Sequence, residues 1–184
     1  HSLASSLAQG RGAYNEAIEH IDQCTDILSK ESPEWEVLAL RKVNLQIMAY
    51  VKTGDDMYFK SATDQLTEML QVQPNNGSLM NNLAYLLTDN DQQLETALEY
   101  ARKAHRTDPG NANYLDTYAY AQCKNGQYEQ AEQSLIRSIQ IYDVSGQSIP
   151  WDLYEHFGMA KEGLDKSAEA QQKQQKARTA AEGR

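Results

Sequence analysis

A tripeptide made of a bulky residue, alanine and tyrosine returns along this sequence at a fixed interval of 35 residues. Its three copies are residues 48–50, 83–85 and 118–120. Other alanines keep nearly the same interval, because Ala62, Ala97 and Ala131 follow the alanine of each copy by 12 or 13 residues. A repeat of this length predicts a solenoid, in which each unit buries its apolar face by stacking on the next.

Each repeat contains two stretches with helical apolar spacing, separated by a polar or glycine-containing turn. The clearest pair is residues 112–124 and 129–142, separated by Asn125-Gly126-Gln127. Apolar residues three and four positions apart predict helices that bury one face. The small alanines let two such helices approach closely, and one pair alone cannot cover its own apolar face. The sequence therefore predicts stacked helix hairpins.

This pattern resembles the tetratricopeptide repeat family, whose helix–turn–helix units are about 34 residues long. The resemblance covers roughly residues 12–180 and is clearest over 111–142. It implies an all-α fold, an α-α superhelix. The residues that match the family pattern are Tyr118-Ala119 (bulky-small pair), Gly126 (turn glycine), Tyr128 (aromatic between the helices), Ala131 (small residue of the second helix) and Asp108-Pro109-Gly110-Asn111 (closing turn).

We expect one domain, residues 1–184, built as a right-handed solenoid of about four to five hairpins. Gly10 and Gly12 are expected to break the first helix, and Gly163 to separate the last two. The polar final segment, residues 165–181, is expected to be a capping helix on which nothing stacks. The expected units are residues 2–31 (partial), 33–74, 76–109, 111–143 and 148–181.

The two cysteines lie about three repeats apart, so a disulfide between Cys24 and Cys123 is not expected in a solenoid where only neighbouring units touch. Cys24 and His20 are four residues apart, a spacing that can hold a metal ion. The chain offers them no obvious further ligand, and the spacing from Ile21 places Cys24 on the predicted core face. The spacing of His20 and Cys24 is therefore expected to be a chance pair rather than a metal site.

The chain is acidic, with a net charge of −9 and a pI of about 4.9. This charge argues against nucleic-acid binding, which needs a clustered basic surface, and against anionic membranes. An acidic surface suits basic or polar peptide partners, although solubility is the simpler explanation. No apolar run approaches the ~18 residues that a membrane-spanning helix needs.

The location of the protein is left open by the sequence. The chain begins with His1-Ser2 and has no signal-peptide pattern. The missing methionine suggests a segment cut from a longer protein, from which a leader or an anchor could have been removed. A cytoplasmic location is favoured, and an extracytoplasmic one stays open.

The resemblance also implies a binding surface, because in this family the first helix of each pair lines a concave groove. Tyrosine suits recognition, since it offers rigid apolar area with one polar tip. The alternative is that the repeated tyrosines only pack between adjacent first helices. The fifth unit offers Asp152 besides Glu155, in a less certain register. The candidate groove residues are Gln46, Tyr50, Ser78, Asn81, Tyr85, Thr88, Asn113, Asp116, Tyr120, Lys124 and Glu155.

The chemistry of these faces narrows the partner. Chaperone-binding members of the family clamp a terminal carboxylate with Lys, Arg and Asn. Here Lys124 is the main cation on faces that otherwise carry amides and carboxylates. We therefore expect no carboxylate clamp, and a partner segment that is basic, amide-rich or apolar.

No catalytic pattern is found, because the four histidines are scattered and no phosphate loop or nucleophile elbow is present. No catalytic residue, cofactor or metal site is predicted, and the chain is not expected to be an enzyme. The predicted function is a protein-binding scaffold. The alternatives are an accessory or regulatory segment of a larger enzyme or of a secretion or assembly machine, and self-association, with a possible homodimer formed through exposed Trp35, Leu38 and Val43.

Overall fold

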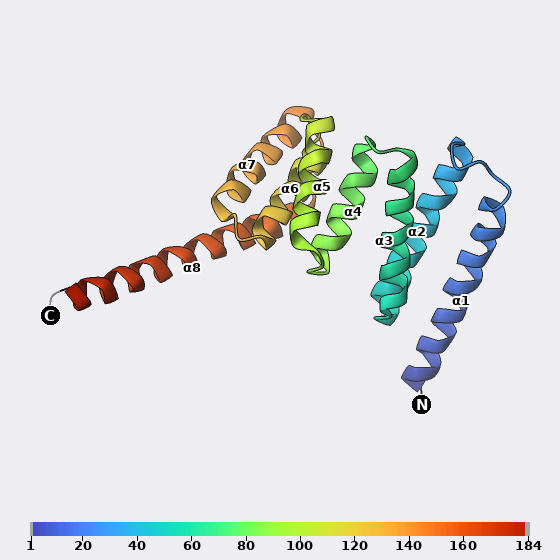
Figure 1. The fold of residues 1–184 in the computed structure, drawn as a ribbon, viewed down its shortest axis with the longest axis horizontal. Helices are drawn as coiled ribbons and strands as arrows, with labels where there is room; N and C mark the ends of the chain where they lie inside the picture. Colours follow the sequence, from blue (N-terminus) through green and yellow to red (C-terminus); the bar gives the residue numbers. More distant parts are fainter. Residues whose placement is uncertain (1, 183–184) are drawn as a thin grey trace. The chain divides into compact units, whose positions relative to one another are not determined.

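The computed structural model describes the backbone of residues 2–182 and the side chains of residues 12–168, and over these residues it contains helices and no strands (Figure 1). The all-α prediction is thus confirmed. The two helices predicted over 112–124 and 129–142 are found at Ala112–Lys124 and Tyr128–Ser145. The helices are α1 (Ser2–Thr25), α2 (Pro33–Thr53), α3 (Asp56–Val72), α4 (Gly77–Asp89), α5 (Leu94–Thr107), α6 (Ala112–Lys124), α7 (Tyr128–Ser145) and α8 (Trp151–Glu182).

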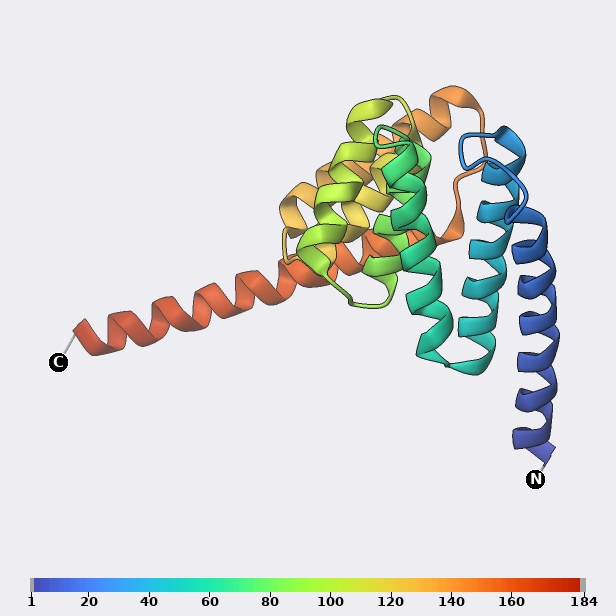
Figure 2. The same cartoon turned by 45° about the vertical axis from the view of Figure 1, so that its right-hand side comes forward.

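The chain forms two compact units, His1–Leu79 and Met80–Arg184, called unit 1 and unit 2 below. In unit 1, α2 packs against both α1 and α3, and the three helices lie side by side in Figures 1 and 2. Their shared core buries the small and apolar residues that the repeat pattern places inside. These are Ala39, Val43, Ala49, Ala62, Leu66 and Met69.

Unit 2 contains α4 from Met80 onward and the helices α5 to α8. In this unit α6 packs against α5, α7 and α8, and α7 also packs against α8. Ala84 of α4, Ala101 of α5 and Ala121 of α6 form one fully buried cluster. Contact between consecutive helices, together with contact between α6 and α8, is the arrangement of stacked hairpins.

The helix ends follow the local signals in the sequence. Ser32 is the N-cap of α2, and its side chain accepts a hydrogen bond from the Trp35 backbone N–H at 3.2 Å, with Pro33 at the first helical position. Gly54 ends the same helix in the left-handed conformation at φ 66°, which glycine adopts without steric cost. Asn111 caps α6 in the same way as Ser32 caps α2.

Two predicted helix breaks are wrong. The helix α1 runs continuously through Gly10 and Gly12, and α8 runs continuously through Gly163. The last two predicted helices are therefore one. A single glycine costs a helix about 1 kcal/mol relative to alanine, which neighbouring turns can offset, whereas a proline would be needed to force a break.

Two predictions about side-chain exposure are also wrong, one for Cys24 and one for a surface of α2. Cys24 lies in the last turn of α1 and is exposed, although its spacing from Ile21 predicted a core position. Trp35 and Val43 are buried, and Leu38 is partly buried, because α2 is covered by helices on two sides. The surface expected to mediate self-association is therefore not exposed, and a homodimer stays an untested prediction.

Gly163 has a packing role in the middle of α8. A Cβ atom at this position would overlap the ring of Tyr128, the first residue of α7. The glycine thus lets the tyrosine ring lie directly on the α8 backbone, which is how the aromatic between the helices is accommodated.

A second glycine in α8 makes this packing testable. Gly163→Ala should lower the free energy of unfolding by about 1–3 kcal/mol, because the new methyl group overpacks the Tyr128 contact. The matched control Gly158→Ala meets no atom within 4 Å and should raise it by up to about 1 kcal/mol through helix propensity. Urea unfolding followed by circular dichroism measures both, and equal effects would contradict the packing role.

Candidate functional site

Three aromatic rings form a row across α4, α6 and α8 of unit 2. The rings of Tyr85 and Tyr120 have centroids 6.0 Å apart and are tilted by 50°. The Tyr120 ring stacks on that of His156 at 4.1 Å with an interplanar angle of 13°. The repeated tyrosine therefore joins one first helix to the next. Tyr85, Tyr120 and His156 are called the aromatic row below.

The aromatic row is exposed at one end. Tyr85 is 37% exposed, whereas Tyr120 is 5% exposed and His156 4% exposed. Tyr120 therefore packs between helices, which is one of the two roles that the sequence predicted. Tyr85 also packs against Tyr120 but is partly exposed to solvent. Of the three rings, Tyr85 is the one that can touch a partner.

The negative charges of four carboxylates act on Tyr85. Burial raises the pKa of Tyr85, and the negative charges of Asp89, Asp152, Asp116 and Glu155 raise it further. Asp89 lies one turn after Tyr85 on α4 and accepts a hydrogen bond from the Tyr120 hydroxyl at 3.3 Å. We call the aromatic row together with these four carboxylates the aromatic-acidic face.

The nearest cation on this face is already paired. The Lys124 Nζ atom lies 2.8 Å from Asp91 Oδ1 and 5.7 Å from the centroid of the Tyr120 ring. Lys124 also lines a cavity of about 240 Å³ between α6, α7 and α8, whose walls include Met159 and Tyr128. The cavity offers apolar surface next to the acidic one.

A buried hydrogen bond fixes α8 to α6 beneath the face. His156 Nδ1 lies 3.0 Å from Asp116 Oδ1, and both side chains are almost fully buried. Burial raises the pKa of Asp116, and the nearby charge of Asp152 adds to this, although the bond to His156 acts in the opposite direction. The pair is therefore an interhelical link rather than an exposed catalytic group.

Two polar side chains of α4 are buried with unused hydrogen-bonding atoms. Asn81 is 5% exposed, and its Nδ2 donates to Asn113 Oδ1 of α6 at 3.2 Å, while its own Oδ1 has no partner. Thr88 is fully buried, and its hydroxyl oxygen also has no partner. Because residues 81, 85 and 88 share one face of a helix, these groups flank Tyr85.

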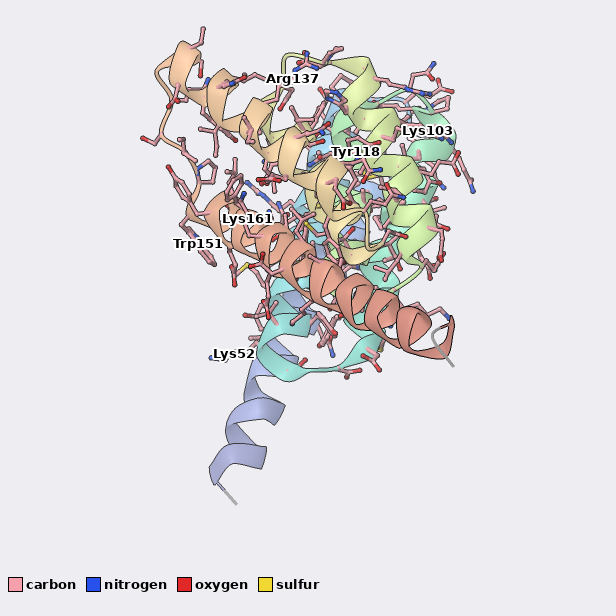
Figure 3. All side chains as sticks on the ribbon, turned by 90° about the vertical axis from the view of Figure 1, so that its left-hand side faces the viewer. Lys52, Lys103, Tyr118, Arg137, Trp151 and Lys161 are labelled. Carbon is pink, nitrogen blue, oxygen red and sulfur yellow. The ribbon has the colours of Figure 1, made fainter. Side chains whose placement is uncertain are left out.

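Exposed aromatic side chains begin α8. Trp151 is 77% exposed and Tyr154 is exposed, and Figure 3 shows Trp151 pointing away from the start of this helix. Asp152 and Glu155 follow them in the same two turns. Large exposed apolar groups beside charged ones are typical of surfaces that bind other proteins.

The remaining predicted residues are placed differently. Gln46 is buried in unit 1, where its Nε2 donates to Ser61 Oγ at 2.7 Å. Tyr50 is partly buried, and its ring lies 5.6 Å from that of Phe59. Ser78, Asn113 and Glu155 are exposed. The structure thus brings together Asn81, Tyr85, Asn113, Asp116, Tyr120 and Lys124 in unit 2 and keeps Gln46 with the unit 1 core.

Sequence reasoning missed Asp89 and His156. A usable signal existed for both, because side chains four residues apart lie on the same face of a helix. Asp89 follows Tyr85 by four residues, and His156 follows Asp152 by four.

Within the described residues no three His, Cys, Asp or Glu side chains are arranged to hold a metal ion. Among those residues, too, no helix combines the length and hydrophobicity needed to cross a membrane.

No protein-family model matches the sequence, and no curated protein sequence matches it. Solved structures match in fold. The nearly identical TPR-like repeats of a putative kinesin light chain from Podosopora anserina are 19% identical, over 97% of this chain and 93% of that one, with a TM-score of 0.63. MamA of AMB-1 is 20% identical, over 98% of both chains, with a TM-score of 0.59.

A third match is the TPR2B domain of yeast Sti1, solved as a complex with pHsp70. It is 20% identical, over 68% of this chain and 98% of that one, with a TM-score of 0.54. The chain has a tetratricopeptide repeat fold. The structural resemblance expected from residues 111–142 is thereby confirmed, and the tetratricopeptide fold places Tyr85 and Tyr120 on successive first helices.

The two cysteines of this tetratricopeptide array should differ in reactivity. Burial raises the pKa of Cys123 to about 11, and the charge of Asp116 contributes, whereas Cys24 is exposed. We expect a thiol reagent near neutral pH to modify Cys24 quickly and Cys123 only after unfolding, because the thiolate is the reactive form. Cys24→Ser should abolish the fast reaction. Equal rates for both thiols would contradict the buried position of Cys123.

The buried Asp116 should make stability depend on pH. Because its folded pKa is raised, its contribution to the free energy of unfolding is full below its unfolded pKa of about 4 and falls as the pH rises through the folded value. Asp116→Asn cannot ionise, so the stability of the wild type relative to this variant should fall over the same window. Urea unfolding at several pH values measures this. Asp143→Asn, at an exposed position of α7, controls for the lost charge. Parallel pH profiles of stability for the wild type and Asp116→Asn would contradict the predicted pH dependence.

Proposed function

We propose that this chain is a non-catalytic protein-interaction module that holds a segment of a partner protein on the aromatic-acidic face of unit 2. The observation that carries the proposal is the exposed ring of Tyr85, held in place by Tyr120 behind it. A rigid, half-exposed tyrosine supplies contact area at low entropic cost. The Sti1 domain with the same fold, solved with pHsp70, supports protein binding in general.

The charge of the face favours a basic or amide-rich segment over a terminal carboxylate. Tyr85 is surrounded by the charges of four carboxylates, and the nearby ammonium group of Lys124 is bound to Asp91. An incoming carboxylate would meet like charge without a free cation to receive it, which is the repulsion that excludes wrong partners at interfaces. The cavity beside Lys124 suits an apolar side chain of the same segment.

The amide groups on α4 and α6 suit a peptide backbone. Asn113 is exposed at the start of α6 and lies next to the buried Asn81. An amide side chain offers both a donor and an acceptor, so it can pair with an extended backbone in either sense. We therefore assign backbone contact to this end of the face and side-chain recognition to Tyr85.

The buried polar groups do not favour catalysis. His156 is almost fully buried, so a substrate has no access to its ring without opening the interface between α6 and α8. Burial also keeps the Cys123 thiol protonated near neutral pH, and the thiol form is a poor nucleophile. An accessory role within a larger enzyme or assembly machine would use the same face for binding.

A random-peptide display selection on the immobilised chain tests the proposal. Peptides enriched by selection should lose about tenfold or more in affinity with Tyr85→Ala, because a central aromatic contact typically contributes more than 1 kcal/mol. Tyr100→Ala, a partly buried tyrosine of α5, should leave affinity unchanged. Fluorescence anisotropy gives the dissociation constants, and circular dichroism checks the fold. Peptides that bind Tyr85→Ala as well as wild type would count against this face.

A further inference from the structure

The helix α2 of unit 1 leaves one apolar face open to solvent. Val37, Met48 and Val51 lie on this face and are 61%, 56% and 78% exposed. Arg41 and Asn44 lie between them and are also exposed. The five residues are three or four positions apart, so they share one side of the helix. We call them the α2 stripe.

The next repeat buries the equivalent side of its first helix. Leu79, Leu83 and Leu86 follow three residues of the α2 stripe by 35 positions, the interval of the repeat. Their exposed fractions are 1%, 3% and 4%. This side of a first helix is therefore a packing surface in the array, and α2 carries such a surface without a covering helix.

The α2 stripe differs from an ordinary solvent-facing helix surface. The exposed positions of α5 carry only charged residues and threonines, as expected where a helix meets water. Residues 37–53 of α2 contain no acidic residue, although the whole chain has a net charge of −9. Solubility alone thus gives no reason for the composition of the stripe.

The spacing along this face is that of a two-stranded coiled coil. Val37, Asn44 and Val51 occupy successive a positions of a heptad, and Leu40 and Ile47, both partly exposed, occupy the d positions between them. Valine at position a favours two parallel strands, and a single asparagine at a specifies their register. The Asn44 side chain has no hydrogen bond with another described residue, so its amide can pair with an identical one.

Charge complementarity selects a second copy of α2 as the occupant. In a parallel pair of helices, position g of one helix faces the following position e of the other. Glu36 occupies g and Arg41 occupies e, so Glu36 meets the partner's Arg41, and the symmetry of the pair repeats this contact. Arg41 has no ion pair with another described residue. Glu36 accepts a hydrogen bond from Gln73 through Oε2 only, at 2.9 Å, and keeps its second oxygen.

The size of the stripe sets the strength of such a pair. Unit 1 already holds α2 as a helix, so association does not include the cost of forming one. The face over residues 37–51 is about 22 Å long, and one helix face of this length buries less than the about 800 Å² per partner of a standard interface. We therefore expect a weak dimer, with a dissociation constant of about 10–100 μM.

We infer that two copies of this chain associate through α2 of unit 1, as a short parallel coiled coil with Asn44 at its centre. The surface is distinct from the buried one around Trp35 and Val43. It is also independent of the function proposed for unit 2.

A concentration series tests the inference. Sedimentation equilibrium of the 184-residue chain from about 5 to 500 μM should give an apparent mass that rises from 20.7 kDa toward twice that value. Val51→Lys should weaken association about tenfold or more, because it places a charge in the seam. Val144→Lys, the same substitution at a 91% exposed position of α7, should leave the mass curve unchanged. Circular dichroism checks the fold of each variant.

A charge exchange tests the orientation of the pair. Arg41→Glu should weaken the dimer about threefold or more, because it places like charges opposite each other. Adding Glu36→Lys restores an opposite-charge pair and should recover most of the loss. In an antiparallel pair g faces g and e faces e, so the double variant would stay weak.

Two results would overturn the inference outright. One is an apparent mass of 20.7 kDa at every concentration, and the other is a dimer on which Val51→Lys and Val144→Lys have equal effects. A double variant that stays as weak as Arg41→Glu would overturn the parallel arrangement. Tyr85→Ala should leave the mass curve unchanged, so this experiment and the peptide selection on unit 2 can fail separately.

Discussion

The close approach of helices at repeated alanines is the constraint on which the rest of the structure depends. Ala84 and Ala119 are fully buried, and each is followed directly by a tyrosine of the aromatic row. Neighbouring residues of a helix point about 100° apart. When the alanine faces the second helix of its own hairpin, the tyrosine is turned toward the next first helix. The bulky-Ala-Tyr pattern therefore sets both the packing within a hairpin and the contact between hairpins.

Much of the fold could be predicted because its signals are local and repeated. The turn at Asn125-Gly126, the cap at Ser32 and the buried alanines all depend on residues a few positions apart. The two helix breaks could not be predicted from glycine alone, since Gly163 is explained by the ring of Tyr128, a contact 35 residues away in sequence. The same limit applies to Cys24, because helical spacing alone did not predict its exposure in the last turn of α1.

The candidate site was predictable in its residues but not in their roles. Periodicity placed Asn81, Tyr85, Asp116 and Tyr120 on first-helix faces, yet it could not tell an exposed ring from a buried one. Tyr85 is exposed and Tyr120 is buried although both occupy the same repeat position, because His156 of α8 covers only the second. A histidine that looked isolated in sequence thus decides which of the two tyrosines is covered.

The buried His156–Asp116 link also connects stability to the proposed binding face. It joins α8 to α6 at 3.0 Å, and Asp152 and Glu155 stand within the same turn of α8 as His156. Both residues keep their positions relative to α6 only while α8 stays packed on that helix. The energetic cost of burying a carboxyl group at Asp116 therefore falls where the buried link fixes the helix that carries Asp152 and Glu155. If the acidic residues served only to keep the protein soluble, α8 would not need to be fixed to α6 by a buried link. Dispersed charges keep a protein soluble wherever they lie.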